Sequence, residues 1–502
     1  MKVSGLGHFP LGTPVPNKEH AVCVSLPTLE DVVGYEEKRP DTLHRLSSGY
    51  PRFVRHRKIK ELADFWNQTH TLHNKDLFFF PKTRDWDFAS KTLRITDAST
   101  EEVEDYLIAG LDPDSEESSQ LHKFFQHAGC GLSSRHAEKI LESLGLTVMS
   151  EAITPNLHAE REIKNVISKA HGPQIDADDV IIASSGANAF TSVFRSALEI
   201  SRTKQKKIWI RIGWLYLDTL EIMNLLRAPR EQIIDLHTPE EYETLEEIFL
   251  AHGSNIAGVV TEFPSNPLLH SCNLEKLRDL TIRHDSILIA DPTMASPKNA
   301  KVSRYADVVI NSLTKYANWE GDVMMGSAVF PKNSPIGLEI KQKAEEYLNK
   351  PFSRDIERMA EQIPFYNNFI DRTNQSQEEV VNFLESHPKI KKVFWAYQQS
   401  TGANYERIAG CHKPGCVVSF EIDGNFKDFY DNLDMLKSPS FGTEFSLCCP
   451  YIYLAHYQLI GKASGRKTLS KAGLSPELLR LSIGLESTEE IKQKIASALL
   501  KC

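Results

Sequence analysis

The chain has 502 residues, a length that predicts about three domains, each large enough to bury its own core. Its 58 Lys and Arg residues and 67 Asp and Glu residues give a formal charge of −9, and 41% of its residues are hydrophobic. This ordinary globular composition excludes a disordered or fibrous protein. An acidic chain without a dense cationic block is also a poor match for nucleic acid, whose counterions must be displaced by positive charge.

No apolar run approaches the roughly 18–20 residues that a membrane-spanning helix requires, and the first residues lack the pattern of a secretory signal. The eight cysteines are scattered without the spacing of a metal site or a disulfide framework. We therefore expect a cytoplasmic protein that binds neither a membrane nor a metal.

The first third of the chain carries few strong signals. Residues 1–60 are rich in loops and proline, which predicts an arm that wraps around another part of the structure. Residues 61–165 alternate charged and apolar positions at helical spacing, which predicts a helical insert.

Residues 166–345 alternate short apolar runs with helical patterns, and residues 346–502 repeat this on a smaller scale. Strands that are apolar on both faces and separated by helices predict a mainly parallel sheet covered by helices. In the larger part we expect strands at 180–183, 208–212, 256–261, 287–290, 307–310 and 327–330. In the smaller part we expect them at 393–397, 417–422 and 479–483. The predicted fold class is α/β, with a smaller C-terminal α/β domain.

Polar residues collect where these strands end. Ser185 and Gly186 stand between the first strand and a helix, where free backbone N–H groups suit a phosphate, although a capped helix is an alternative interpretation. Asp291 directly follows the fourth strand, and Lys315 lies just after the fifth. Because the carboxyl ends of parallel strands meet at one edge of a sheet, these groups are expected to lie together. A lysine that can form a Schiff base and an aspartate that can pair with a pyridinium nitrogen are what pyridoxal 5′-phosphate (PLP) chemistry requires.

Several motifs strengthen this interpretation. They are SNPLL at 265–269, ADPT at 290–293, SLTKY at 312–316 and LRLSIGLE at 479–486. In order and spacing they resemble the transsulfuration (Cys/Met metabolism) enzymes, which use PLP and have the aspartate-aminotransferase-like fold type I with a seven-stranded sheet. LGTPVP near the start, FFQHAGCGLSSR at 124–135 and GTEFSLCCPYIYLAHY at 442–457 are similar to the long cystathionine γ-synthases of fungi.

The resemblance implies roles for individual residues. Lys315 would form the Schiff base and move protons, Asp291 would pair with the ring nitrogen, and Tyr216 would stack on the ring and act as a catalytic acid or base. The implied cofactor-binding set is Tyr50, Arg52, Ser185, Gly186, Ala187, Tyr216, Asp291, Thr293, Ser312, Thr314 and Lys315. The implied substrate-binding set is Asn266, Ser446 and Arg480, with Arg480 gripping the α-carboxylate.

In such enzymes a tyrosine and an arginine enter the site from the neighbouring subunit, and Tyr50 and Arg52 fit that role. This implies a homodimer or homotetramer that acts on small amino-acid substrates.

The activity implied is γ-replacement on an O-acyl-L-homoserine through a vinylglycine ketimine, with cysteine as the nucleophile and cystathionine as the product. Two alternatives within the same chemistry are a sulfide, carbon or amine nucleophile in a specialised pathway, and a γ-lyase. A catalytically inactive scaffold is a third, disfavoured by the intact Lys315, Asp291, Tyr216 and Arg480.

Some positions depart from the family pattern. Asn188 stands in the phosphate turn where a small residue is usual, Trp319, Glu320, Gly321 and Met325 follow the lysine, and Phe445 replaces a common glutamate. These changes are expected to border the substrate pocket and therefore leave the nucleophile open.

Overall fold

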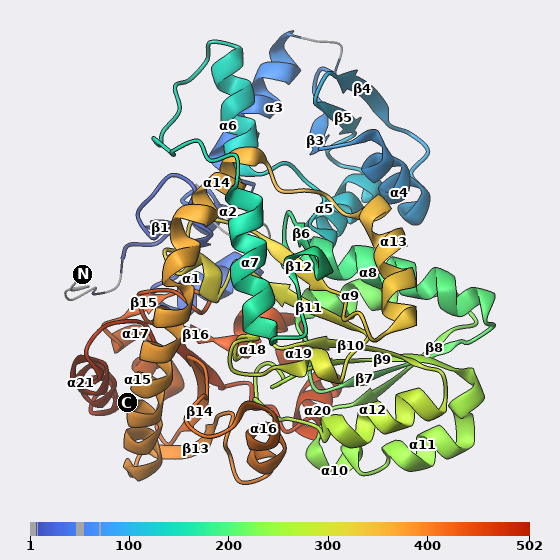
Figure 1. Ribbon diagram of the computed structural model, residues 1–502. Helices are drawn as coiled ribbons and strands as arrows, with labels where there is room; N and C mark the ends of the chain where they lie inside the picture. Colours follow the sequence, from blue (N-terminus) through green and yellow to red (C-terminus); the bar gives the residue numbers. More distant parts are fainter. Residues whose placement is uncertain (1–6, 8, 47–54, 70–71) are drawn as a thin grey trace.

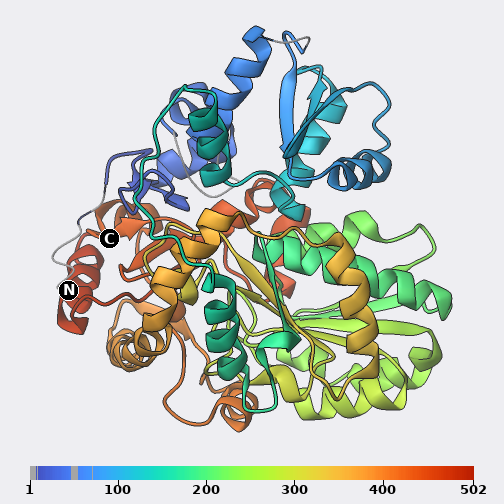
Figure 2. The ribbon, with the colours of Figure 1, turned by 45° about the horizontal axis from the view of Figure 1, so that its top comes forward.

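The computed structural model describes residues 7, 9–46, 55–69 and 72–502. Figure 1 shows three regions: a central sheet covered by helices, a small domain above it built from residues between 57 and 143, and a C-terminal domain beside it. In a view turned by 45° the small domain lies above the central sheet and its helices (Figure 2). Apolar residues of the segment 9–46 pack against the C-terminal domain.

The central sheet has seven strands in the order β6-β12-β11-β10-β9-β7-β8, and only β12 runs antiparallel to its neighbours. Their bounds are β6 Val180–Ala183, β7 Ile208–Ile212, β8 Gln232–Leu236, β9 Ile256–Glu262, β10 Ile287–Asp291, β11 Val308–Ser312 and β12 Gly326–Val329. This confirms the predicted mainly parallel seven-stranded sheet. Strand β8 was not among the expected strands, because as an edge strand it is only partly buried and lacks a continuous apolar run.

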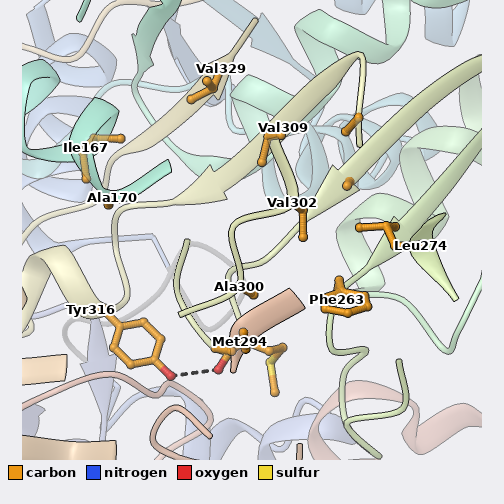
Figure 3. Packing of buried hydrophobic residues seen from close by; sticks show 14 of the residues in the cluster. Ile167, Ala170, Phe263, Leu274, Met294, Ala300, Val302, Val309, Tyr316 and Val329 are labelled. Carbon is orange, nitrogen blue, oxygen red and sulfur yellow. Dashed lines mark hydrogen bonds between the residues drawn. The ribbon is translucent and has the colours of Figure 1, made fainter. Parts of the chain in front are cut away.

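Helices cover both faces of this sheet. On one face α8 Gly186–Thr203, α9 Leu217–Leu226 and α13 Pro335–Tyr347 bury their apolar sides. On the other face lie α7 Ala159–His171, α11 Leu245–His252, α12 Leu274–Arg283, α14 Ser353–Gln362 and α15 Tyr366–Ser386. Figure 3 shows this second core, in which Ile167 of α7 and Leu274 of α12 lie near Val309 and Val329 of the sheet. Shorter elements are α10 Pro239–Tyr242, η1 Ala177–Asp179, η2 Gly253–Asn255, η3 Val302–Arg304, η4 Tyr316–Asn318 and η5 Ile363–Phe365.

The insert is not purely helical, so that prediction is wrong. Its core is a three-stranded antiparallel sheet in the order β3-β5-β4, with bounds Asp76–Phe80, Tyr106–Leu111 and Ser99–Val103 respectively. Phe79 points to a layer of α3 Arg57–Thr69 and α6 Ser134–Ser143. Phe78 and Phe80 point the opposite way, to α4 Thr83–Leu93 and α5 Glu116–Ala128. This alternation is the period of a strand, but it is not visible in the sequence, because β3 and β5 are buried on both faces and β4 is mostly exposed and charged.

The C-terminal domain is a five-stranded sheet in the order β13-β14-β17-β16-β15. Its strands are β13 Ile390–Phe394, β14 Val417–Ile422, β15 Leu436–Lys437, β16 Leu447–Pro450 and β17 Leu479–Ser482. Its helices are α16 Gly402–Ala409, α17 Phe426–Asn432, α18 Tyr451–Ala455, α19 Tyr457–Ile460, α20 Ala463–Lys471 and α21 Thr488–Leu499. Three of these strands were predicted, and β15 and β16 were missed because they are short. No helix in the described ranges is both long and apolar enough to cross a bilayer.

The described part of the arm packs on its own chain. It contains β1 Pro14–Val15, β2 Cys23–Val24, α1 Leu29–Glu36 and α2 Pro40–Leu43. Leu26 N donates to Lys437 O (3.0 Å), and Tyr430 Oη donates to Leu26 O (2.9 Å). The apolar residues of α1 join the core of the C-terminal domain. The arm therefore closes this domain, and its predicted contact with a neighbouring subunit stays a prediction.

A buried ion-pair network attaches the insert to the rest of the chain. Arg135 of α6 is 1% exposed, and its Nε donates to Glu151 (2.9 Å) while Nη1 donates to Asp355 of α14 (3.0 Å) and to the Asp322 carbonyl (2.8 Å).

We expect Arg135→Ala to lower the free energy of unfolding by about 3–5 kcal/mol, because it leaves the buried carboxylate of Asp355 without its partner. Urea denaturation measures this. The exposed Arg161, which pairs with Asp178, provides the matched control, and Arg161→Ala should lower the free energy of unfolding much less than Arg135→Ala. Equal losses in the two variants would contradict a stabilising role for the network.

A buried histidine is expected to make the fold sensitive to acid. His171 at the end of α7 is fully buried, and neither ring nitrogen has a hydrogen-bond partner among the described residues. Burial lowers the pKa of His171 to about 3. Between about pH 6.5 and pH 3 the unfolded chain therefore binds a proton at this residue that the folded chain does not.

The protein is accordingly expected to lose stability as the pH falls from about 6.5 toward 3. His171→Leu should reduce this loss, measured as the difference in melting temperature between pH 7 and pH 5. His158→Leu, at an exposed histidine, should leave the difference unchanged. If the two variants behave alike, His171 does not contribute to acid sensitivity.

Candidate active site

Strands β9, β10 and β11 end at the same edge of the central sheet, beside the start of α8, and together they border a cavity of about 70 Å³. Most of the residues singled out in the sequence line it. These are Gly186, Ala187, Tyr216, Asn266, Asp291, Thr293, Ser312, Lys315 and Arg480. The structure thus gathers side chains that lie up to 294 positions apart, from Gly186 to Arg480, into one site.

The start of α8 is built to present free backbone N–H groups. Ser185 is the N-cap, and its hydroxyl accepts a hydrogen bond from Asn188 N (3.0 Å). A Cβ on Gly186 would come within 2.9 Å of Ser312 Cβ, so this turn requires glycine to approach β11. Asn188 turns away from the cavity, since its Oδ1 accepts from Asn349 N (2.8 Å). An 18-residue helix that begins at a cavity offers a site for an anion such as a phosphate.

Thr293 and Thr314 play different parts. The Thr293 hydroxyl accepts from Ser312 N (2.9 Å), and Thr293 N donates to Asp291 Oδ1 (2.8 Å), so Thr293 joins the ends of β10 and β11. The Thr314 hydroxyl donates to Met325 O (3.1 Å) and accepts from Met325 N (3.0 Å). Thr314 is not among the described residues that line the cavity, and its hydroxyl stabilises the loop that carries Lys315.

Lys315 lies just beyond β11 and is only 9% exposed. Its Nζ donates to Ser440 Oγ (3.1 Å) and lies 5.0 Å from the centre of the Phe441 ring. The amine is therefore held inside the cavity by residues from the C-terminal domain. Neither Ser440 nor Phe441 was predicted, because they belong to an irregular loop without a strand or helix pattern.

Two buried carboxyls lie side by side at this edge, since Asp291 pairs with Glu262 in the register of β10 and β9. Burial raises the pKa of Asp291 to about 6. Burial, and to a smaller extent the neighbouring Asp291, raise the pKa of Glu262 to about 8. Glu262 accepts from Tyr216 N (2.5 Å) and Asn266 N (2.8 Å), so it fixes two cavity loops. A positively charged group bound next to Asp291 would relieve the cost of burying its charge.

Arg480 of β17 supplies a buried positive charge opposite the strand ends. Its Nη1 donates to Asn266 Oδ1 (2.9 Å), Nη2 donates to the Pro439 carbonyl, and the guanidinium lies 4.9 Å from the centre of the Tyr451 ring. Asn266 Nδ2 in turn donates to Tyr451 Oη (2.6 Å). This arrangement holds the planar fork in place, ready for a carboxylate.

Some predicted site residues lie elsewhere. Ser446 is not among the described residues that line the cavity. Its hydroxyl donates to Glu486 (2.9 Å) and accepts from Gly484 N (2.9 Å). Tyr50 and Arg52 lie outside the described residues. The cavity also receives His127 from the insert, which the sequence did not single out.

The expectation that the unusual residues after Lys315 border the pocket is wrong. Trp319 Nε1 donates to the Gln362 carbonyl (3.0 Å), Glu320 pairs with Lys18 (2.7 Å), and Met325 is buried in the sheet core. Phe445 packs with β1 and β2 of the arm. Gly321, at φ 80°, packs against Phe445, and a Cβ there would lie 3.2 Å from that ring. These residues bind the arm and α14 to the loop that follows Lys315 and are not among the described side chains that line the cavity.

The sequence is similar to a known protein family and to several known proteins. The family model for Cys/Met metabolism PLP-dependent enzymes matches residues 174–500. The chain is 30% identical to an L-2-amino-4-chloropent-4-enoate dechlorinase/desaturase of Streptantibioticus cattleyicolor over 97% of each chain. It is 26% identical to a cystathionine gamma-synthase of Neurospora crassa over 98% of each chain.

Solved structures with the same fold include a cystathionine gamma synthase from Xanthomonas oryzae pv. oryzae, with a TM-score of 0.56 and 20% identity over 70% of this chain and 89% of that one. A cystathionine gamma-lyase from Lactobacillus plantarum gives a TM-score of 0.57 and 19% identity over 71% of this chain and 91% of that one. Both matches cover most of the solved chain and leave more than a quarter of this one unmatched. The family model likewise begins after the insert.

Proposed function

Because the chain belongs to the Cys/Met metabolism family of PLP-dependent enzymes, we propose that its cavity catalyses γ-replacement on an O-acyl-L-homoserine. The nucleophile is the thiol of L-cysteine, and the product is cystathionine. The observation that carries this proposal is the meeting of Lys315, Asp291 and Arg480 in one cavity.

The residues present fit PLP. A buried carboxyl at Asp291 suits a protonated ring nitrogen, the start of α8 suits the phosphate, and the amine of Lys315 suits the aldehyde. When bound, PLP supplies an electron sink conjugated to the amino nitrogen of the substrate.

Lys315 moves the protons in this proposal. Its amine takes a proton from Cα of the substrate, then one from Cβ, and returns protons after the new bond has formed. Burial of the amine beside Ser440 keeps it close to the reacting carbons and away from bulk water.

Arg480 and Asn266 orient the substrate. The guanidinium binds the α-carboxylate through two parallel hydrogen bonds. Asn266, which already accepts from Nη1, holds the guanidinium in its orientation. Holding the carboxylate fixes the direction of the Cα–H bond relative to Lys315, so that binding energy is used for orientation.

Tyr216 acts at the γ-carbon. The Cγ–O bond breaks and the acyl group leaves as a carboxylate. The cysteine thiol then loses its proton and forms the Cγ–S bond, with the Tyr216 phenol as acid or base. Glu262 holds Tyr216 in position through the backbone N–H.

The experiment is to incubate the PLP-loaded protein with O-acetyl- and O-succinyl-L-homoserine, together with cysteine, sulfide or a carbon nucleophile, and to identify products by mass spectrometry. Cystathionine formation supports the proposal. Release of only 2-oxobutanoate and ammonia with every partner overturns it.

A second candidate is γ-elimination from a halogenated amino acid. The 30% identity over 97% of each chain with the dechlorinase/desaturase favours it, since that relative is named for loss of chlorine from C4. Release of chloride from L-2-amino-4-chloropent-4-enoate by this protein, faster than any turnover of O-acylhomoserines, would select this candidate.

We propose that Tyr50 and Arg52 complete the site of a neighbouring subunit, so that the active form is at least a dimer. Arg52→Ala and Lys315→Ala should each be inactive alone, and a co-expressed mixture should regain activity because hybrid dimers contain one intact site. A mixture as inactive as its parents contradicts shared sites.

A further inference from the structure

The insert reaches the active site through the last turn of α5. His127 lies in this turn and lines the cavity together with Gly186, Ala187 and Phe190 of α8. Figure 1 places α5 at the junction between the insert and α8. The family model begins at residue 174, so His127 belongs to a part of the chain that the model does not cover.

The imidazole is held by a carboxylate. His127 Nδ1 donates to Asp218 Oδ1 (2.9 Å), and the Asp218 side chain is 4% exposed. Asp218 lies in the first turn of α9, so the C-terminal end of one helix meets the N-terminal end of another. A histidine at a helix C-terminus and an aspartate at a helix N-terminus both interact favourably with the helix dipoles. With Nδ1 committed to Asp218, Nε2 is the nitrogen available to a ligand.

The position of α5 shows which end of the cavity His127 faces. Two residues after His127, Gly129 ends the helix with φ 63° and lies against the start of α8. A Cβ on Gly129 would come within 2.2 Å of Ser185 Oγ and 3.1 Å of Asn188 N, and Ser184 Oγ donates to Gly129 O (3.3 Å). His127 is thereby fixed next to the helix N-terminus that suits the phosphate.

The positions of the basic side chains point the same way. Among the described residues that line the cavity, the basic side chains are His127, Lys315 and Arg480. Lys315 donates to Ser440 and Arg480 donates to the Pro439 carbonyl, both of the C-terminal domain, and Arg480 also donates to Asn266. A phosphate at the start of α8 carries close to two negative charges, which backbone N–H groups offset only in part.

We propose that His127, positioned by Asp218, binds the phosphate group of PLP, so that the insert contributes a side chain to the cofactor site of its own chain. The imidazole donates a hydrogen bond through Nε2, and Asp218 balances its charge. This inference depends on the family's cofactor and not on the substrate, because it concerns PLP alone.

The test compares cofactors with and without a phosphate. The apo form of the full-length protein is titrated with PLP and with pyridoxal, and Kd is read from the absorption of the bound cofactor. His127→Asn is expected to weaken PLP binding about 10- to 100-fold, the loss typical of a hydrogen bond to a charged group, and to change pyridoxal binding less than twofold. The ³¹P resonance of bound PLP should shift in the same variant.

The matched control lies in the same helix. His122 pairs with Asp76, with 2.6 Å between Nε2 and Oδ2, and lies outside this cavity. His122→Asn should bind both cofactors like the wild type. Asp218→Asn, which keeps the shape of the carboxylate, should weaken PLP binding by a smaller factor than His127→Asn.

The proposal is overturned if His127→Asn binds PLP with wild-type affinity, or if it loses affinity for PLP and pyridoxal equally. Normal PLP affinity with a lower kcat would assign His127 to the substrate instead, which also overturns it. An enzyme that binds PLP as expected but ignores O-acylhomoserines would contradict the proposed function and leave this inference standing.

Discussion

Lys315→Ala is expected to lower kcat by at least about 10³-fold, because it removes both the amine that joins the cofactor and the group that moves the protons. The visible absorption of the PLP-loaded protein should change at the same time, since the link between cofactor and chain is lost. Steady-state kinetics and an absorption spectrum measure the two effects in one preparation. Lys315→Arg keeps the positive charge and should be equally inactive, which separates the chemistry of the amine from its charge.

The control for this prediction is Lys301, an exposed lysine on the way to β11. Lys301→Ala should retain the wild-type rate and spectrum. A Lys315→Ala variant with more than a tenth of the wild-type activity and an unchanged spectrum would show that another residue holds the cofactor.

Arg480→Ala is expected to lower kcat/KM by roughly 10²- to 10³-fold, the equivalent of about 3–4 kcal/mol, because two charge-assisted hydrogen bonds to the substrate carboxylate are lost. Most of this effect should appear in KM, since the carboxylate is bound before and after each chemical step. Arg480→Lys should recover part of the loss but not all, because an ammonium cannot reproduce the planar fork.

A substrate analogue distinguishes binding from structural damage. An amine that lacks the α-carboxylate should react slowly with the wild-type enzyme and no more slowly with Arg480→Ala. An equal loss of kcat/KM for the amine and the amino acid would contradict a carboxylate-binding role. Arg407→Ala, at an exposed arginine, provides the reference for nonspecific effects.

The sequence was sufficient to predict those parts of the fold and the site in which a short sequence pattern reflects a local structure. The central strands could be predicted because they are apolar on both faces, and the polar residues at their ends could be placed together because parallel strands share one edge. Asp291 and Lys315 follow from this argument without any knowledge of the loops.

Other parts of the site depend on tertiary contacts that no local pattern encodes. Ser440 reaches Lys315 from an irregular loop, and His127 reaches the cavity only because the whole insert docks beside α8. Ser446 shows the opposite case: its motif resembles that of the family, yet its hydroxyl is used by Glu486 and Gly484. The sheet of the insert was missed because β3 and β5 are buried on both faces and β4 is charged, so none of the three shows a polar and apolar alternation.

The arm at the start of the chain can reach its final packing only after the C-terminal domain has been synthesised. The carbonyl of Leu26 accepts a hydrogen bond from Tyr430, which lies 404 residues later in the chain. The arm has therefore left the ribosome long before Tyr430 is synthesised. At about 5–20 residues per second the interval is roughly 20–80 s. Throughout that time the apolar face of α1 is without the C-terminal core that buries it, so this segment is prone to aggregation until synthesis is complete.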